Sequence, residues 1–227
     1  MNRHSIARWI QVFSLLGLAS FILCGPPSAS AQEGIDDLWS PTDIRKFREA
    51  FIENFKRTGL STTPEDAAFL RVTVESSNAQ RGIEVGSFTG FGAIHMGMGF
   101  ERTGGHLITI EIDSDIAQQC RENIRKVGLD KTVTVVEGDA LKVIPELEGK
   151  FDFMFIDAVK KDYFKYFNAA RFLLKPGAVI VADNVIQSAD AMRDFLDAMK
   201  TDPDYDMVII QCSEEKSDGM AVIYKVR

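Results

Sequence analysis

The sequence predicts an α/β fold built on one doubly wound sheet of seven strands, mostly parallel, with helices on both faces. From residue 81 onward, short apolar runs alternate with amphipathic segments. This alternation is typical of β-α-β units and a parallel sheet, and right-handed crossovers place helices on both faces. The chain ends on two strand-like runs joined by a polar turn, so the last strand should run antiparallel. The expected strands lie at 81–85, 106–112, 132–137, 151–156, 178–182, 206–213 and 219–226.

Two helices should precede the sheet. Ser40-Pro41 and Thr63-Pro64 each join an N-cap residue to a proline at the first helical position. The second of these helices should run to about Asn78. The first carries an aromatic residue at every fourth position, which predicts a stripe that faces the core. The members of this stripe are Phe47, Phe51 and Phe55.

The first 31 residues have the layout of a secretory signal peptide. A short basic start is followed by an apolar run over 9–23, and Ala29-Ser30-Ala31 forms a small-x-small cleavage signal. The run is too short for a comfortable membrane span, so no stable span should remain after cleavage following Ala31. The protein is then exported, to the periplasm or the medium. Without cleavage it is membrane-anchored, or cytoplasmic if the start is misassigned. The expected division is 1–31 signal peptide, 32–60 linker and helix, and 61–227 main domain.

Composition limits the classes of partner. The chain has 227 residues, 45% of them hydrophobic, which suits one globular domain with a sizeable core. Its formal net charge is −7, and no cluster of basic residues interleaved with aromatic ones is present. Nucleic acid is therefore not an expected partner, and a small molecule is.

The segment Glu84–Gly92 follows a predicted strand and begins a helix. Gly86 and Gly90 permit a tight turn and a close approach of the backbone to a ligand, although a purely structural turn is the alternative. The dinucleotide pattern G-x-G-x-x-G is absent. Glu111, at the end of the second strand, is placed to accept hydrogen bonds from ribose hydroxyls, unless it is a solvated strand end. Asp139 follows the third strand and could bind an adenine amino group, cap a helix, or do both.

Acidic and amide side chains follow the fourth and fifth strands. Asp157 ends the fourth strand, and Asp183 and Asn184 end the fifth. Because neighbouring parallel strands end at one edge about 4.8 Å apart, these side chains should converge on one ion, unless the two aspartates are merely helix caps. Two carboxylates and an amide oxygen suit Mg²⁺, or less selectively Mn²⁺ or Ca²⁺. Lys160 lies one turn beyond Asp157. A nearby cation lowers the pKa of an amine, which makes Lys160 a candidate general base.

Together these motifs resemble the cation-dependent O-methyltransferases, the group that contains catechol and caffeoyl-CoA O-methyltransferases. The resemblance covers the chain from about Thr62 onward and implies a Rossmann-like fold, with S-adenosylmethionine in the crevice of the glycine loop. It implies that Asp157, Asp183 and Asn184 hold the metal, that Lys160 is the base, and that the protein is a homodimer. The implied cofactor-binding residues are Thr62, Glu84, Gly86, Ser87, Phe88, Gly90, Gly92, Glu111, Asp139, Ala140 and Asp157.

The chain departs from this group at Gly92, where relatives often carry a serine. The segment 213–217 (SEEKS) also differs, and its carboxylates, Glu214 and Glu215, are candidate contacts for the acceptor. The function expected is metal-dependent methylation of a phenolic or catechol-like hydroxyl. Two alternatives are an exported binding protein that kept the fold without turnover and a nicotinamide-dependent oxidoreductase. The missing dinucleotide glycine argues against the second alternative.

Overall fold

A computed structural model describes residues 40–227, so the predicted signal peptide and most of the predicted linker lie outside the described residues. Its centre is a seven-stranded sheet in the order β3-β2-β1-β4-β5-β7-β6. β7 runs antiparallel to both of its neighbours, and the pairs among β1 to β5 are parallel. The predicted fold class is therefore confirmed. The strands are β1 Arg81–Val85, β2 His106–Glu111, β3 Val133–Glu137, β4 Phe151–Ile156, β5 Leu174–Ala182, β6 Tyr205–Ser213 and β7 Asp218–Lys225.

The strand boundaries agree with the prediction to within one residue, except at the start of β5. β5 begins at Leu174 rather than at 178. The Lys175-Pro176-Gly177 sequence is typical of a turn, but Leu174 pairs with Phe151 of β4 across an irregularity in the register. This pairing extends the strand through a proline that local pattern alone would exclude.

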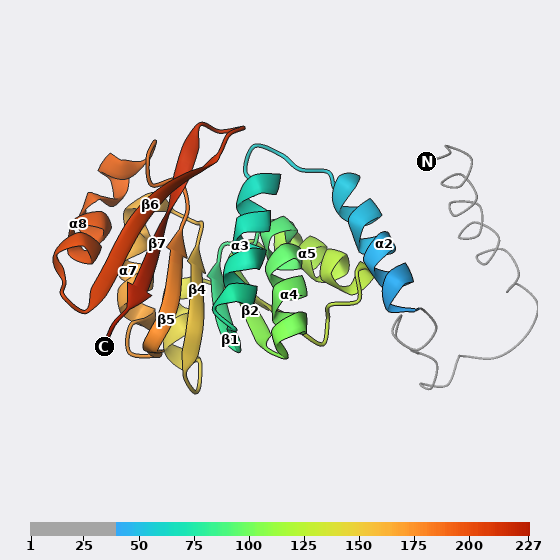
Figure 1. Ribbon diagram of the computed structural model, residues 1–227, viewed down its shortest axis with the longest axis horizontal. Helices are drawn as coiled ribbons and strands as arrows, with labels where there is room; N and C mark the ends of the chain where they lie inside the picture. Colours follow the sequence, from blue (N-terminus) through green and yellow to red (C-terminus); the bar gives the residue numbers. More distant parts are fainter. Residues whose placement is uncertain (1–39) are drawn as a thin grey trace, which may run out of the picture.

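The helices cover both faces of the sheet, with α3, α4 and α5 on one side and α7 and α8 on the other (Figure 1). Ser40 and Thr63 cap the first two helices as predicted, each accepting a hydrogen bond from a backbone N–H three residues later. The second ends at Ser76 rather than near Asn78, which has a positive φ of 50°. The helices are α2 Pro41–Glu53, α3 Pro64–Ser76, α4 Phe91–Thr103, α5 Ser114–Lys126, α6 Ala140–Val143, α7 Tyr163–Ala170 and α8 Arg193–Thr201, with short 3-10 turns η2 Ile144–Glu146, η3 Lys160–Asp162 and η4 Ala189–Met192.

The sheet separates two hydrophobic cores. Successive side chains of a strand point to opposite faces, and β4 shows this clearly. Met154 and Ile156 belong to the core shared with α7 and α8. Phe153 and Phe155 belong to the core shared with α3, α4 and α5. All six residues of β4 are buried, as expected for a central strand covered on both faces.

The first helix docks through one buried cation. Arg48 of α2 is 4% exposed. Its guanidinium pairs with both carboxylate oxygens of Glu101 at 2.5 and 2.9 Å and donates to the carbonyl oxygens of Val127 and Gly128. The predicted aromatic stripe is only partly buried. Phe51 and Phe55 pack on the α3–α5 core but stay partly exposed.

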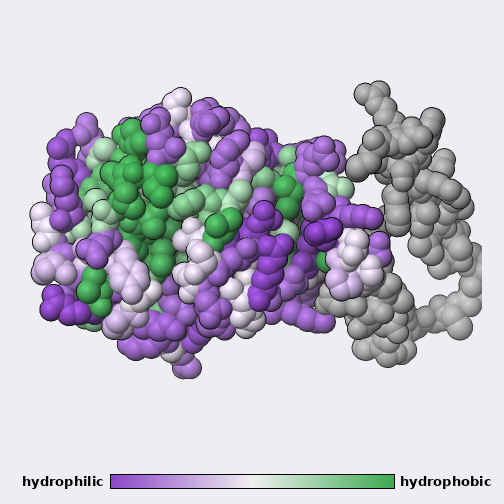
Figure 2. All heavy atoms as spheres, in the orientation of Figure 1, coloured by the Kyte–Doolittle hydropathy of each residue, from purple (hydrophilic) through white to green (hydrophobic). Residues whose placement is uncertain are grey.

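The described surface has one notable apolar region. Figure 2 shows apolar side chains gathered over the β6–β7 hairpin, where Val208 and Ile209 are 56% and 45% exposed. β6 is an edge strand, and these two neighbouring residues point to opposite faces of it. Between residues 40 and 227, no helix has the length and apolar character needed to cross a membrane.

Candidate active site at the carboxyl edge of the sheet

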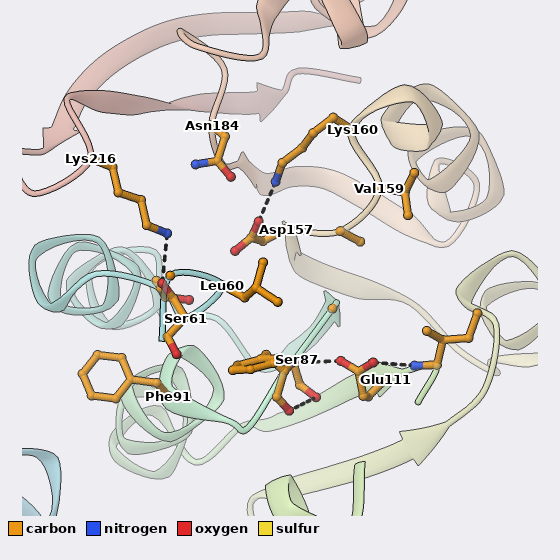
Figure 3. A pocket seen from close by; sticks show the side chains of 16 residues that line it. Leu60, Ser61, Ser87, Phe91, Glu111, Asp157, Val159, Lys160, Asn184 and Lys216 are labelled. Carbon is orange, nitrogen blue, oxygen red and sulfur yellow. Dashed lines mark hydrogen bonds and ion pairs between the residues drawn. The ribbon is translucent and has the colours of Figure 1, made fainter. Parts of the chain in front are cut away.

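A cavity of about 410 Å³ lies where the parallel strands end (Figure 3). The loops after β1, β2, β4 and β5 line it, together with the segment 59–62 and Lys216. The prediction that residues from several strand ends meet at one edge is therefore correct. The predicted residues that line the cavity are Thr62, Gly86, Ser87, Phe88, Glu111, Asp157, Lys160 and Asn184.

The loop after β1 needs glycine at two positions. Gly86 and Gly90 have φ values of +89° and +93°, which residues with a Cβ rarely adopt. A Cβ on Gly86 would also lie 2.2 Å from the carbonyl oxygen of Asp157. The loops that follow β1 and β4 thus touch backbone to backbone, and this close approach forms the floor of the cavity.

Glu111 is held rigidly at the edge of the cavity. Its Oε1 accepts hydrogen bonds from the backbone N–H groups of Ile112 and Asp113, and its Oε2 accepts one from Phe88 at 2.9 Å. An ionised carboxylate offers about four acceptor positions, so one remains beyond these three. Glu111 is therefore not a solvated strand end. Its carboxylate is oriented before any ligand arrives.

Several predicted cofactor residues do not line the cavity. Asp139 accepts from the backbone N–H of Leu141 and caps α6, and Ala140 is buried behind it. The capping role of Asp139 is thus shown, and the adenine contact, which the cap does not exclude, stays a prediction. Three further predicted cofactor residues, Glu84, Gly90 and Gly92, do not line the cavity either. The predicted metal ligand Asp183 is also absent from its lining.

Glu84 and Gly92 lie beneath the glycine loop. Glu84 is fully buried, and its Oε2 has no hydrogen-bond partner among the described residues. Burial raises the pKa of its carboxyl group to about 8, and the negative charges of Asp157 and Glu111 add to this shift. A Cβ on Gly92 would lie 3.0 Å from Thr62 Oγ1 and 3.2 Å from Glu84 Oε1. Because glycine has no side chain, position 92 leaves room for these two polar atoms.

Lys160 stands beside Asp157, as the sequence predicted. Its Nζ donates to Asp157 Oδ1 at 2.7 Å and to the hydroxyl oxygen of Tyr163 at 2.8 Å. That hydroxyl donates in turn to the backbone carbonyl of Asp183 at 3.2 Å. Tyr163 was not assigned a role from the sequence. Its position three residues after Lys160, one turn along a helical segment, was the available signal.

Asp183 is fully buried at the end of β5. Its Oδ1 accepts from the backbone N–H of Asn184 at 2.8 Å, and its Oδ2 has no partner among the described residues. Burial raises the pKa of this carboxyl group to about 8, and the negative charges of Asp157 and Asp66 add to the shift. A buried acceptor without a partner, close to a second carboxylate, is a place that favours a cation.

Asn184 is oriented by a residue far along the chain. It has a positive φ of 60°, and its Nδ2 donates to Asp218 Oδ2 at 3.3 Å. The other oxygen of Asp218 accepts from the backbone N–H groups of Ile186, Gln187 and Gly219. Asp218 thus holds the whole loop after β5 and directs the amide oxygen of Asn184 away from itself.

The donor set at this edge fits a divalent cation. In the range 40–227, no group of three or more His, Cys, Asp or Glu side chains is arranged to hold a metal ion. An ion at this edge would take its ligands from Asp157, Asp183 and the amide oxygen of Asn184. Oxygen donors of this kind are those that Mg²⁺, Ca²⁺ and Mn²⁺ prefer, and the unpartnered Oδ2 of Asp183 supplies one of them.

The sheet order with an antiparallel β7, the glycine loop after β1 and the fixed acid after β2 define the class of Rossmann-like methyltransferases. The sequence profile of the family described as O-methyltransferase matches residues 39–217. The chain therefore belongs to the O-methyltransferase family, and the resemblance seen in its motifs is confirmed.

Individual relatives agree with this assignment. A catechol O-methyltransferase of Niastella koreensis is 35% identical over 148 residues, which cover 63% of this chain and 65% of the relative. The chain thus spans slightly less than two thirds of that relative. A catechol O-methyltransferase of Mycobacterium tuberculosis is 34% identical over 72% of this chain and 80% of its own length. Among solved structures, an O-methyltransferase of Streptomyces achromogenes in complex with SAM has a TM-score of 0.71 at 26% identity, covering 83% of this chain and 92% of that one.

Proposed function

We propose that this protein is an S-adenosylmethionine-dependent O-methyltransferase that requires a divalent metal and acts on a small phenolic or catechol-like hydroxyl. The observation that carries the proposal is the grouping of Asp157, Lys160 and Asn184 around the cavity, with the buried Asp183 beside them. Catechol O-methyltransferases among the relatives support the choice of acceptor.

The methyl donor is assigned to the glycine-loop side of the cavity. There the backbone of Gly86–Phe88 faces open space, and Glu111 stands ready to accept from ribose hydroxyls. The Streptomyces relative contains SAM and a Bacillus cereus O-methyltransferase of the same fold contains SAH, which supports this assignment. Asp157 and Lys160 line another part of the same cavity, where the methyl group of the bound donor would be transferred.

The acceptor hydroxyl is assigned to the opposite side. Asp157, Asp183 and Asn184 would hold the divalent ion. When bound, such an ion lowers the pKa of a hydroxyl that coordinates it. Lys160 Nζ, in its neutral form, would receive the proton, since it lies at the cavity wall and Tyr163 fixes its position. Holding the oxygen in line with the sulfonium methyl group then supplies a further part of the rate.

The proposal is tested by removing the base and one ligand. Lys160→Ala and Asp157→Ala should each lower kcat for a catechol by about 10²-fold or more, because the proton acceptor or the cation is lost. The affinity for S-adenosylhomocysteine, measured by calorimetry, should stay within about threefold for Lys160→Ala. Lys161→Ala, which changes the adjacent exposed lysine, is the matched control and should retain activity.

The same assay is run with Mg²⁺ and with a chelator. Chelation should abolish turnover by the unmodified protein, and added Mg²⁺ should restore it. Full activity of Asp157→Ala in the presence of chelator would show that the metal mechanism is wrong.

A further inference from the structure

Lys216 is a cation in the cavity wall that no sequence motif indicated. It lies in the turn between β6 and β7, half-buried, and its side chain reaches the space between Asn184 and Ser61 (Figure 3). Its Nζ donates to the carbonyl oxygen of Ser61 at 2.9 Å. An ammonium group has three N–H donors, so two remain for other partners.

Lys216 forms no ion pair within residues 40–227, although acidic residues precede it in the turn. Glu215 is exposed and pairs instead with Arg57 at 3.0 Å. Neither Glu214 nor Glu215 lines the cavity, and a contact between these carboxylates and the acceptor stays a prediction. A half-buried charge without a counter-charge costs free energy, and an anionic group in the cavity would offset that cost.

The turn that carries Lys216 is held in place. The Arg57–Glu215 pair and the Lys216–Ser61 hydrogen bond both join it to the segment before α3. The guanidinium of Arg57 also lies 5.6 Å from the ring centroid of Phe91. The ammonium of Lys216 is therefore positioned by the fold rather than left free on a surface loop.

The sheet order places this cation on the acceptor side. Glu111 ends β2, and β1, β4 and β5 lie between β2 and β7. At about 4.8 Å per strand, four steps separate β2 from β7 by about 19 Å. Two apolar side chains border the space between, Leu60 and Val159, which are 73% and 51% exposed. An aromatic ring in that space would cover apolar surface that is now exposed to solvent.

We propose that Lys216 selects acceptors that carry a carboxylate on the ring that bears the reactive hydroxyl. The ammonium binds the carboxylate, and the hydroxyl lies at Asp157 and Lys160. This inference rests on the proposed function and narrows its acceptor to hydroxylated aromatic acids.

The test compares two acceptors that differ in one charge, 3,4-dihydroxybenzoate and its neutral amide. In Lys216→Met, which keeps the apolar stem and removes the charge, kcat/KM for the benzoate should fall about tenfold or more. The value for the amide should change less than about threefold. Lys216→Arg should retain most of the preference for the acid, and Lys161→Met, at an exposed lysine outside the cavity, should behave as the unmodified protein.

A binding measurement separates the acceptor from the cofactor. Calorimetry of 3,4-dihydroxybenzoate with the protein saturated by S-adenosylhomocysteine should show the same loss of affinity in Lys216→Met. If instead the affinity for S-adenosylhomocysteine itself falls, Lys216 binds the carboxylate of the cofactor and the inference is overturned. Equal effects on the acid and the amide would also overturn it, while leaving the proposed function in place. If the unmodified protein methylates neither acceptor, the proposed function fails as well.

Discussion

Single carboxylates at the carboxyl edge of the sheet have distinct surroundings, and these surroundings determine what each can do. Glu111 accepts three backbone hydrogen bonds and borders the cavity. Asp183 keeps one oxygen without a partner among the described residues. Both carboxylate oxygens of Asp218 accept hydrogen bonds from the loop after β5, and Asp218 does not line the cavity. Asp218 thus orients Asn184, and we expect its influence on the reaction to pass through that residue.

Asp218→Asn tests this positioning role. The substituted residue can keep its oxygen toward the three backbone N–H groups, which places its NH₂ group against the NH₂ group of Asn184. Two donors facing each other should turn or displace the amide of Asn184. We expect the Mg²⁺ concentration for half-maximal activity to rise about tenfold, a typical effect of losing a residue that orients a ligand.

Binding of Mn²⁺, followed by calorimetry, should weaken in parallel, while the affinity for S-adenosylhomocysteine stays the same. Asp206→Asn, at an exposed carboxylate of β6, is the control. A metal titration unchanged by Asp218→Asn would mean that Asn184 does not depend on this contact.

At the scale of elements, the site is a set of loops in backbone contact. The loop between β1 and α4 approaches the loop after β4 so closely that Gly86 has no room for a side chain. Gly104, the C-cap residue of α4, also has a positive φ, of 73°, but no atom lies within 4 Å of where its Cβ would be. Replacing Gly104 by alanine would cost free energy through backbone conformation alone. Replacing Gly86 would add a steric clash to that cost.

Gly86→Ala and Gly104→Ala should therefore differ. Gly104→Ala should lower the free energy of unfolding by about 1 kcal/mol through backbone strain alone. Gly86→Ala adds a clash with the Asp157 carbonyl, so its loss should be larger and should extend to function. We expect its affinity for S-adenosylhomocysteine to fall about tenfold or more, with no change in Gly104→Ala. Urea unfolding and calorimetry measure both effects, and equal losses in the two variants would show that the clash is relieved at no cost.

At the scale of the whole molecule, one hydrophobic core lies on each face of the sheet, and α2 packs against one of them. The apolar residues Phe51 and Phe55 of this segment pack on that core but stay partly exposed. Its main attachment is the buried guanidinium of Arg48, which pairs with Glu101 and with two carbonyl groups of the loop after α5. We therefore expect this polar contact to contribute more to the stability of this end of the molecule than the packing of α2 does.

Arg48→Ala should lower the free energy of unfolding by about 2–3 kcal/mol, because it leaves buried acceptors without partners. Arg45→Ala removes an exposed ion pair with Glu49 on the same helix. This change should alter the free energy of unfolding by less than about 0.5 kcal/mol. Urea denaturation of the two variants gives the comparison. A loss below 1 kcal/mol for Arg48→Ala would mean that apolar contacts hold the helix.

Much of this protein follows from its sequence alone. The strands were predictable because buried parallel strands are short, nearly continuous apolar runs, as in β4. Glu111, Asp157 and Asn184 were predictable as site residues because each directly follows a strand, and parallel strands end at one edge. The start of β5 was not, since it depends on the pairing of Leu174 with Phe151 of the neighbouring strand.

The tertiary structure alone decided the contacts that join distant segments. Asn184 and Asp218 are 34 residues apart in the chain, and Ser61 and Lys216 are 155 apart. The residues adjacent in sequence do not indicate such pairs, because each of these residues lies in a polar segment typical of a turn. The chemistry at the strand ends was therefore visible in the sequence. The contact that orients Asn184 and the position of the Lys216 ammonium in the cavity wall both depend on how the last hairpin packs against the rest of the molecule.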